Sequence, residues 1–191
     1  MIFCERQSNL LKNIGSLLLM DKEYSTMRQK LISLITLAFP LYLLALFFII
    51  FGGDRGLYAD LPLKEYALRL MNLIPFKTIT TYLHGLLTSS INPSIALKNL
   101  CSNLLMFLPM GFYLPFFIRK LHSWKVFLFV MTVFILLLEI SQFLCRKGAL
   151  DIDDLILNLL GASIGFALWN TKFVKKCIAW LEHTENTEQT L

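Results

Sequence analysis

Charged residues are scarce in this chain of 191 residues. Asp, Glu, Lys and Arg make up only 16% of it, whereas 56% is hydrophobic and the mean hydropathy is +0.62. Soluble domains carry about 25% charged residues, so this balance excludes an ordinary soluble globular protein. The chain is expected to be a membrane protein.

Histidine and cysteine are also few, with three and four residues. The paired ligands of a zinc site are missing, and no Ser–His–Asp or Cys–His set is visible, so no metal or cofactor is expected. Lys and Arg lie outside the apolar runs without interleaved aromatic residues, which argues against nucleic-acid binding. Cys101 and Cys145 both fall near the ends of apolar runs. They could form a disulfide with each other, but buried free thiols are the favoured interpretation.

Four apolar runs dominate the sequence. They cover residues 31–51, 100–118, 126–145 and 154–169. About 20 helical residues cross the hydrocarbon core of a bilayer, and each run reaches or approaches that length. The predicted fold is all-α, a multi-pass transmembrane bundle of four helices.

These runs divide the chain into a leader (1–30), a membrane domain (31–172) with a long loop at 52–99, and a tail (173–191). About thirty residues of mixed charge precede the first run, so a cleaved signal peptide is not expected. Apolar residues recur at helical spacing between positions 10 and 18. Either the leader is an amphipathic helix on the membrane surface, or the start is over-extended and Met20 or Met27 is the true initiator.

The distribution of Lys and Arg predicts the orientation in the cell membrane. The leader has five, the connection after the second run has three and the chain after the last run has three (Lys172, Lys175 and Lys176), which makes eleven on one side. The 52–99 loop has five, and two more precede the last run, which makes seven on the other side. Because cytoplasmic loops carry the excess of positive charge, both termini are predicted to be cytoplasmic.

Polar side chains interrupt the second and third runs. Asn103 lies in the second, and Glu139, Gln142 and Arg146 share one helical face at the end of the third. A carboxylate inside a membrane is costly and normally faces the bundle interior with a partner. Glu139 is expected to pair with Arg146 or with Lys98.

The last run has a polar stripe of its own. Asp154, Asn158, Gly161 and Gly165 lie on one face, and the two glycines form a small-xxx-small pair that lets another helix pack closely. With the N-terminus inside, every polar position in the second to fourth runs falls toward the outer leaflet. These side chains are expected to converge there.

The acidic group Asp151, Asp153 and Asp154 has more than one interpretation. Carboxylates at a helix N-terminus accept free backbone N–H groups, so the group could do no more than cap the last helix. The amide of Asn158 one turn further on is not needed for a cap and favours a shared polar site. Chelation of a divalent cation is a third, less favoured interpretation.

Five motifs occur in order between the loop and the last run. They are Asn72-Leu-Ile-Pro-Phe76, Asn103, Phe107-Leu-Pro109-x-Gly111, Glu139-x-x-Gln142, and Gly148-Ala-x-Asp-Ile-x-Asp154-x-x-x-Asn158-x-x-Gly161. With this membrane context, the sequence closely resembles the VanZ-like family of small bacterial membrane proteins.

The resemblance implies a multi-pass protein of the cell envelope, in a family whose namesake is associated with reduced sensitivity to the glycopeptide antibiotic teicoplanin. It also implies candidate binding residues. These are Asn72, Asn103, Glu139, Gln142, Asp151, Asp154 and Asn158, with Arg146 as the candidate for an arginine that relatives often carry just before the acidic group.

Three kinds of function remain open. The favoured one is binding or alteration of an envelope component: the polar groups would hold the head of a lipid-linked cell-wall precursor or an amphiphilic antibiotic, and the spans its tail. In the second, Glu139 or Asp154 is the general base of an intramembrane enzyme acting on a lipid-linked substrate. In the third, the chain is a small transporter or a structural membrane subunit.

Overall fold

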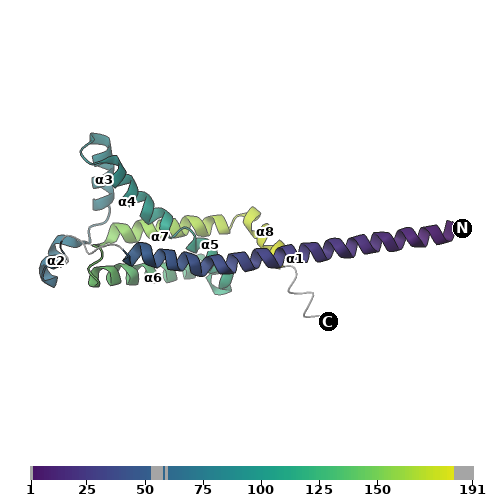
Figure 1. Cartoon of the computed structure of the whole chain (residues 1–191). Helices are drawn as coiled ribbons and strands as arrows, with labels where there is room; N and C mark the ends of the chain where they lie inside the picture. The colour runs from purple at the N-terminus through teal and green to yellow at the C-terminus, as the bar shows by residue number, and fades with distance from the viewer. Residues whose placement is uncertain (1, 53–57, 59, 183–191) are drawn as a thin grey trace. The chain divides into compact units, whose positions relative to one another are not determined.

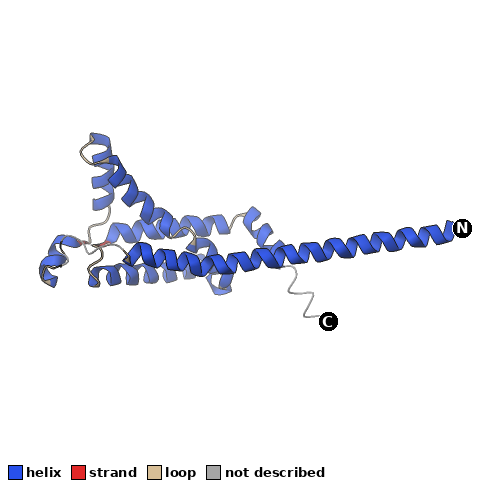
Figure 2. Ribbon diagram, viewed as in Figure 1, coloured by secondary structure: helices blue, strands red, loops and turns tan. Residues whose placement is uncertain are grey.

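The computed structural model describes residues 2–52, 58 and 60–182, and only the backbone of residues 2–21. Nearly all of this part of the chain is helical (Figures 1 and 2), so the predicted all-α class is confirmed. The elements in order are α1 Ile2–Phe51, α2 Leu63–Leu70, β1 Met71–Asn72, α3 Lys77–Thr88, α4 Pro93–Met106, α5 Met110–Phe117, the 3₁₀ helix η1 Arg119–His122, α6 Trp124–Leu144, β2 Leu150–Asp151, α7 Ile152–Trp169 and α8 Lys172–Glu182.

Four helical stretches are long and apolar enough to cross a membrane, as predicted. They are Lys22–Phe51, Pro93–Phe117, Trp124–Leu144 and Ile152–Trp169. The second begins at Pro93 rather than at residue 100, because the Asn92 side chain accepts the backbone N–H of Ser94 at 2.9 Å and caps α4. An Asn followed by Pro at the first helical position is a local start signal, and the prediction from apolar content alone missed it.

The second span is broken in the middle. α4 ends at Met106 and α5 begins at Met110, with Pro109 at the N-cap of α5. Proline disfavours the helical conformation of the residue before it, which accounts for the break. The interruption lets Gly111 approach α7 so closely that a Cβ there would overlap backbone atoms of Ala162 and Phe166.

Two compact units make up the chain: Leu43–Val174, and Met1–Tyr42 together with Lys175–Leu191. In the larger unit α7 is the central helix, because it packs against α4, α5 and α6 (Figure 1). Its Phe166 stacks on Phe127 of α6 with ring centroids 4.3 Å apart, and both side chains are almost completely buried. Burial of large apolar side chains such as these stabilises the bundle around α7.

Glycines set the contact between the second span and α7. A Cβ at Gly161 would overlap the carbonyl of Leu104, and one at Gly165 would overlap the carbonyl of Leu108. Both glycines are buried. The backbones therefore approach more closely than any larger residue would allow, which is how small-xxx-small pairs act in membranes.

The smaller unit contains most of α1 and most of α8. The Arg28 guanidinium lies 4.8 Å from the ring centroid of Trp180, a cation–π contact between the two helices. The side chains of the amphipathic stripe predicted between positions 10 and 18 lie outside the described residues. α8 occupies Lys172–Glu182 at the start of the predicted tail, with lysines interspersed among apolar residues.

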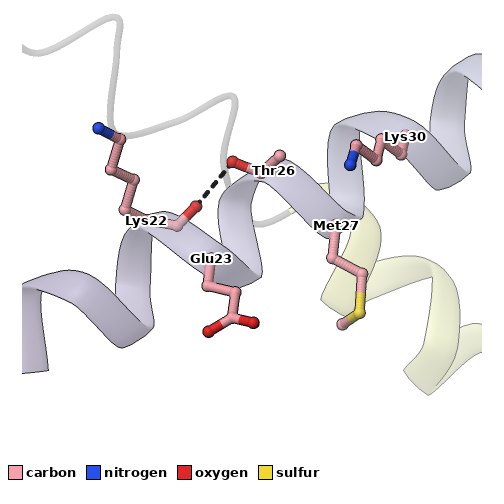
Figure 3. A pocket seen from close by; sticks show the side chains of 5 residues that line it. All are labelled: Lys22, Glu23, Thr26, Met27 and Lys30. Atoms are coloured by element: carbon pink, nitrogen blue, oxygen red, sulfur yellow. Dashed lines mark hydrogen bonds between the residues drawn. The ribbon is translucent and has the colours of Figure 1, made fainter.

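A shallow hollow lies on α1 in this smaller unit (Figure 3). It is lined by Lys22, Glu23, Thr26, Met27 and Lys30, and the Thr26 hydroxyl donates to the Lys22 carbonyl at 2.9 Å. All five belong to neighbouring turns of one helix. None of the candidate binding residues lines it.

Candidate functional site

The candidate residues lie at the end of the larger unit where α6 stops and α7 begins. Two short strands meet there, drawn red in Figure 2: β1 pairs with β2 in parallel, and Asn72 is the register partner of Asp151. The two residues are 79 positions apart in the chain. This pairing fixes the loop segment after α2 against the start of α7.

Asp151 binds both its own helix and the distant loop. Its carboxylate accepts the backbone N–H of Asp153 at 2.9 Å, which makes it the N-cap of α7. It also accepts the Asn72 side-chain amide at 2.9 Å and the Thr78 hydroxyl at 2.5 Å. The cap predicted from the sequence is therefore present at Asp151, but the same side chain also holds the 72–78 segment.

Asp153 caps a different helix from the one that carries it. The side chain is completely buried, at 0% exposure, and accepts three backbone N–H groups at the start of α3. These come from Phe76 at 2.5 Å, Thr78 at 2.7 Å and Ile79 at 3.1 Å. The interpretation of Asp153 as a cap of the last helix is corrected, because its carboxylate satisfies the N–H groups of α3.

We call Asn103, Glu139, Asp154 and Asn158 the intramembrane polar set, because they lie on α4, α6 and α7 within the spans. The Asn103 amide donates to Asp154, and the Asn158 amide donates to Glu139 at 3.4 Å. Glu139 is 6% exposed and Asn158 is 2% exposed. Since Asp154 and Asn158 are one turn apart on α7, the structure brings all four together.

One atom of the intramembrane polar set has no partner among the described residues. The Asn158 side-chain oxygen is buried without a hydrogen bond, although its amide nitrogen contacts Glu139. Buried polar groups are nearly always hydrogen-bonded in folded proteins, so such an exception calls for an explanation. It marks this position as one suited to accept a further donor.

Gln142 and Arg146 lie further along α6, toward its C-terminal end. Gln142 donates to the Ile50 carbonyl of α1 at 3.2 Å. Arg146 donates to the Leu61 carbonyl at 2.9 Å. The predicted pairing of Glu139 with Arg146 or Lys98 is wrong, because Glu139 contacts the Asn158 amide, Arg146 binds backbone, and Lys98 is exposed.

Tyr66 in α2 was not among the predicted site residues, yet it is 1% exposed. Its hydroxyl donates to the Gly148 carbonyl at 2.7 Å, and its ring lies 4.5 Å from the Arg146 guanidinium carbon. Burial raises the pKa of the Tyr66 hydroxyl, and the nearby Arg146 charge opposes that shift. These contacts attach α2 to the 146–148 turn.

The family model described as VanZ/LLP1 matches residues 39–174. The chain belongs to the VanZ/LLP1 family. Protein VanZ of Enterococcus faecium is similar to it, with 29% identity over 112 residues, which is 59% of this chain and 60% of the relative. The chain thus spans about 60% of the length of that curated relative. No solved structure matches.

Every residue of the intramembrane polar set falls inside the VanZ/LLP1 match, as do Asn72, Asp151 and Asp153. The chain is a VanZ-like membrane protein with four apolar helices. Sequence reasoning missed Thr78 and Tyr66 as members of this region. A Thr at the start of a helix and a Tyr on the inner face of an amphipathic helix were the only signals available.

The intramembrane polar set offers hydrogen-bonding groups, and its carboxylates have most of the unused acceptor capacity. In the described part of the chain, no group of three or more His, Cys, Asp or Glu could hold a metal ion. Cys101 and Cys145 are free thiols and do not form a disulfide; both are exposed, so the expectation that they are buried is wrong. The carboxylate and amide oxygens of the intramembrane polar set can accept hydrogen bonds from a ligand's N–H or O–H groups.

Proposed function

We propose that this VanZ-like protein acts in the cell envelope by binding or altering a lipid-linked cell-wall precursor, or an amphiphilic antibiotic, at the intramembrane polar set. The observation that carries the proposal is the buried, incompletely satisfied pair Glu139 and Asn158 inside two membrane-spanning helices. Polar side chains in such positions are costly and tend to be kept for function.

The loop segment after α2 supports the same proposal. Asp151 and Asp153 hold it across the start of α7, next to the intramembrane polar set. A segment anchored at this position is suited to cover a bound head group while the apolar helices contact its tail. We place this end of the bundle at the outer leaflet, with both termini cytoplasmic, on the eleven-to-seven distribution of Lys and Arg.

The proposed physiological role is reduced sensitivity to teicoplanin-type glycopeptides, by analogy with the family. Its test is the antibiotic susceptibility of a strain that lacks the gene and carries either the wild type or a variant. Asp154→Asn and Glu139→Gln keep the side-chain shape and remove one charge, so both should reach normal abundance in the membrane yet fail to restore resistance.

Glu65→Gln is the matched control. Glu65 is exposed on α2, so this substitution removes one negative charge outside the site. It should complement fully. Full complementation by Asp154→Asn and Glu139→Gln as well would refute a role for the intramembrane polar set in resistance. Lipids copurified with wild type but lost from Glu139→Ala, identified by mass spectrometry, would name the bound component.

A further inference from the structure

The carboxylates at this end of the bundle differ in how completely they are satisfied. Asp151 accepts three hydrogen bonds and Asp153 accepts three, so their charges are held by the loop and by the N-terminus of α3. Asp154 accepts one, from Asn103, and Glu139 accepts one at 3.4 Å. The second pair therefore keeps most of its accepting capacity free, since an ionised carboxylate has about four acceptor sites.

Every hydrogen-bond partner of these four carboxylates among the described residues is electrically neutral: an amide, a hydroxyl or a backbone N–H. Arg146 is occupied by the Leu61 carbonyl and the Tyr66 ring. Negative charge inside a bundle is usually paired. Among the described residues, neither Asp154 nor Glu139 has a positively charged hydrogen-bond partner.

The Asn158 side-chain oxygen is a separate observation that points to a ligand. It has no donor among the described residues, in a side chain that is 2% exposed, and so adds a third acceptor to the two partly satisfied carboxylates. The nitrogen of the same amide contacts Glu139, so the oxygen lies close to the Glu139 carboxylate, and Asp154 is one turn away on the same helix. Three acceptors with spare capacity, two of them acidic, match a group that carries several N–H donors and a positive charge.

We propose that Asp154, Glu139 and Asn158 bind the ammonium group of an amine-bearing amphiphile. This inference rests on the proposed function and names its ligand class. An ammonium has three donors, one for each of these side chains, and its charge-assisted hydrogen bonds to carboxylates are stronger than neutral ones. An anionic head group such as a phosphate is repelled by the same side chains and stays outside.

The exposure pattern gives the ligand a route and a place for its tail. Asp154 and Asn103 are half-buried, whereas Glu139 and Asn158 are buried, so the ammonium enters past Asp154. Leu160 on α7 and Leu105 on α4 are 49% and 58% exposed, so the outward faces of both helices are apolar at the depth of the set. Apolar surface at that depth contacts lipid tails, so it can also contact the ligand's alkyl chain.

Wild-type selectivity is the first test and depends on no variant folding. The full chain in nonionic detergent micelles is titrated by calorimetry with dodecylamine at neutral pH, and separately with dodecanol and dodecyl phosphate. These probes share one tail and differ in the head. Saturable binding of dodecylamine, about tenfold or more tighter than either other probe, is expected. Equal binding of dodecanol, tighter binding of dodecyl phosphate, or no saturable dodecylamine binding overturns the proposal.

Variants assign the binding to these side chains. Asp154→Asn at the half-buried position should weaken dodecylamine binding by about tenfold or more, and Glu139→Gln by a similar factor, since each removes one charge-assisted hydrogen bond. Glu65→Gln should bind like wild type, and size-exclusion profiles check that each variant is folded. Wild-type affinity in a folded Asp154→Asn protein refutes the assignment.

Competition against bound dodecylamine distinguishes the natural sources of the amine. Phosphatidylethanolamine, a lipid-linked precursor with a free peptide amine, and teicoplanin are each compared with an N-acetylated form. Displacement by a free amine but not by its acetylated form identifies the source and supports the proposal; displacement that survives acetylation overturns it. Amine binding together with unaltered antibiotic susceptibility of Asp154→Asn cells would refute the envelope role alone.

Discussion

The backbone N–H of Thr78 donates to the Asp153 carboxylate at 2.7 Å, across 75 positions of the sequence. Through this contact a carboxylate on a membrane-spanning helix supplies the cap of α3, a helix in the preceding connection. The α3 N-cap, Phe76, has a left-handed backbone (φ 66°) and no side-chain cap of its own. α3 therefore depends on α7 for the hydrogen bonds at its start.

Asp153→Asn should destabilise the folded protein and loosen the start of α3. An amide keeps one oxygen for the three N–H donors and turns an NH₂ group toward the others, and hydrogen bonds to a charged group contribute about 1.5–3 kcal/mol each. We expect a loss of about 2 kcal/mol or more, measured as a lower thermal midpoint of purified protein, with faster proteolysis between residues 72 and 79. A midpoint equal to that of the Glu65→Gln control would contradict the capping role.

Alanine at Gly161 or Gly165 should separate the second span from α7. Each new methyl would overlap a backbone carbonyl, of Leu104 or Leu108, which has no rotamer with which to move away. Overpacking costs about 1–3 kcal/mol, and a backbone clash belongs at the upper end of that range. Thermal unfolding in detergent measures the effect.

Gly148→Ala is the matched control for these two variants. A Cβ at that position would lie 3.5 Å from the Gln142 Cβ, which is an ordinary contact, and its backbone φ is not positive. Its thermal midpoint should stay at the wild-type value. Equal losses for all three alanines would show that close approach of the backbones is not the reason for the glycines.

Tyr66→Phe should reduce the stability of the folded protein at neutral pH and make that stability less sensitive to pH in the alkaline range. Loss of the bond to the Gly148 carbonyl costs about 1 kcal/mol. Because burial raises the Tyr66 pKa in the folded state, the unfolded chain ionises first, near pH 10. The stability from the buried neutral hydroxyl is therefore present below pH 10 and is lost as pH rises above it.

The measurement is the thermal midpoint of wild type and Tyr66→Phe between pH 8 and 11. The Phe variant should start lower and fall less steeply above pH 10. Tyr24→Phe removes a phenol that is 46% exposed, and it should keep the wild-type profile. Parallel curves for wild type and Tyr66→Phe would show that the buried hydroxyl does not contribute to the alkaline loss.

The orientation in the membrane is testable by labelling. In a background without the four native cysteines, Asp60→Cys should react with a membrane-impermeant thiol reagent in intact cells, because Asp60 is exposed in the connection placed outside by the charge distribution. A cysteine at the exposed Lys172 should react only after lysis. The opposite pattern would reverse the topology and move the intramembrane polar set to the cytoplasmic side.

The sequence alone was sufficient to predict the four spans, because the length of an apolar run and its scarcity of charge are local properties. A helix of about 20 such residues matches the thickness of the hydrocarbon core. The close approach at Gly161 and Gly165 was also predictable, since their spacing puts both on one face of α7. The helix start at Pro93 and helix α8 had local signals that apolar counting ignored.

Which polar groups meet was decided by tertiary structure. Asp151, Asp153 and Asp154 are near neighbours in sequence, yet they bind Asn72, the start of α3 and Asn103 respectively. One helical turn points successive side chains in different directions, and only the packing of α3 and α4 around α7 determines what lies in each direction. For the same reason Glu139 contacts Asn158 rather than Arg146: the partner of a buried carboxylate depends on which neighbouring helix reaches it, and sequence spacing along α6 carries no information about α7.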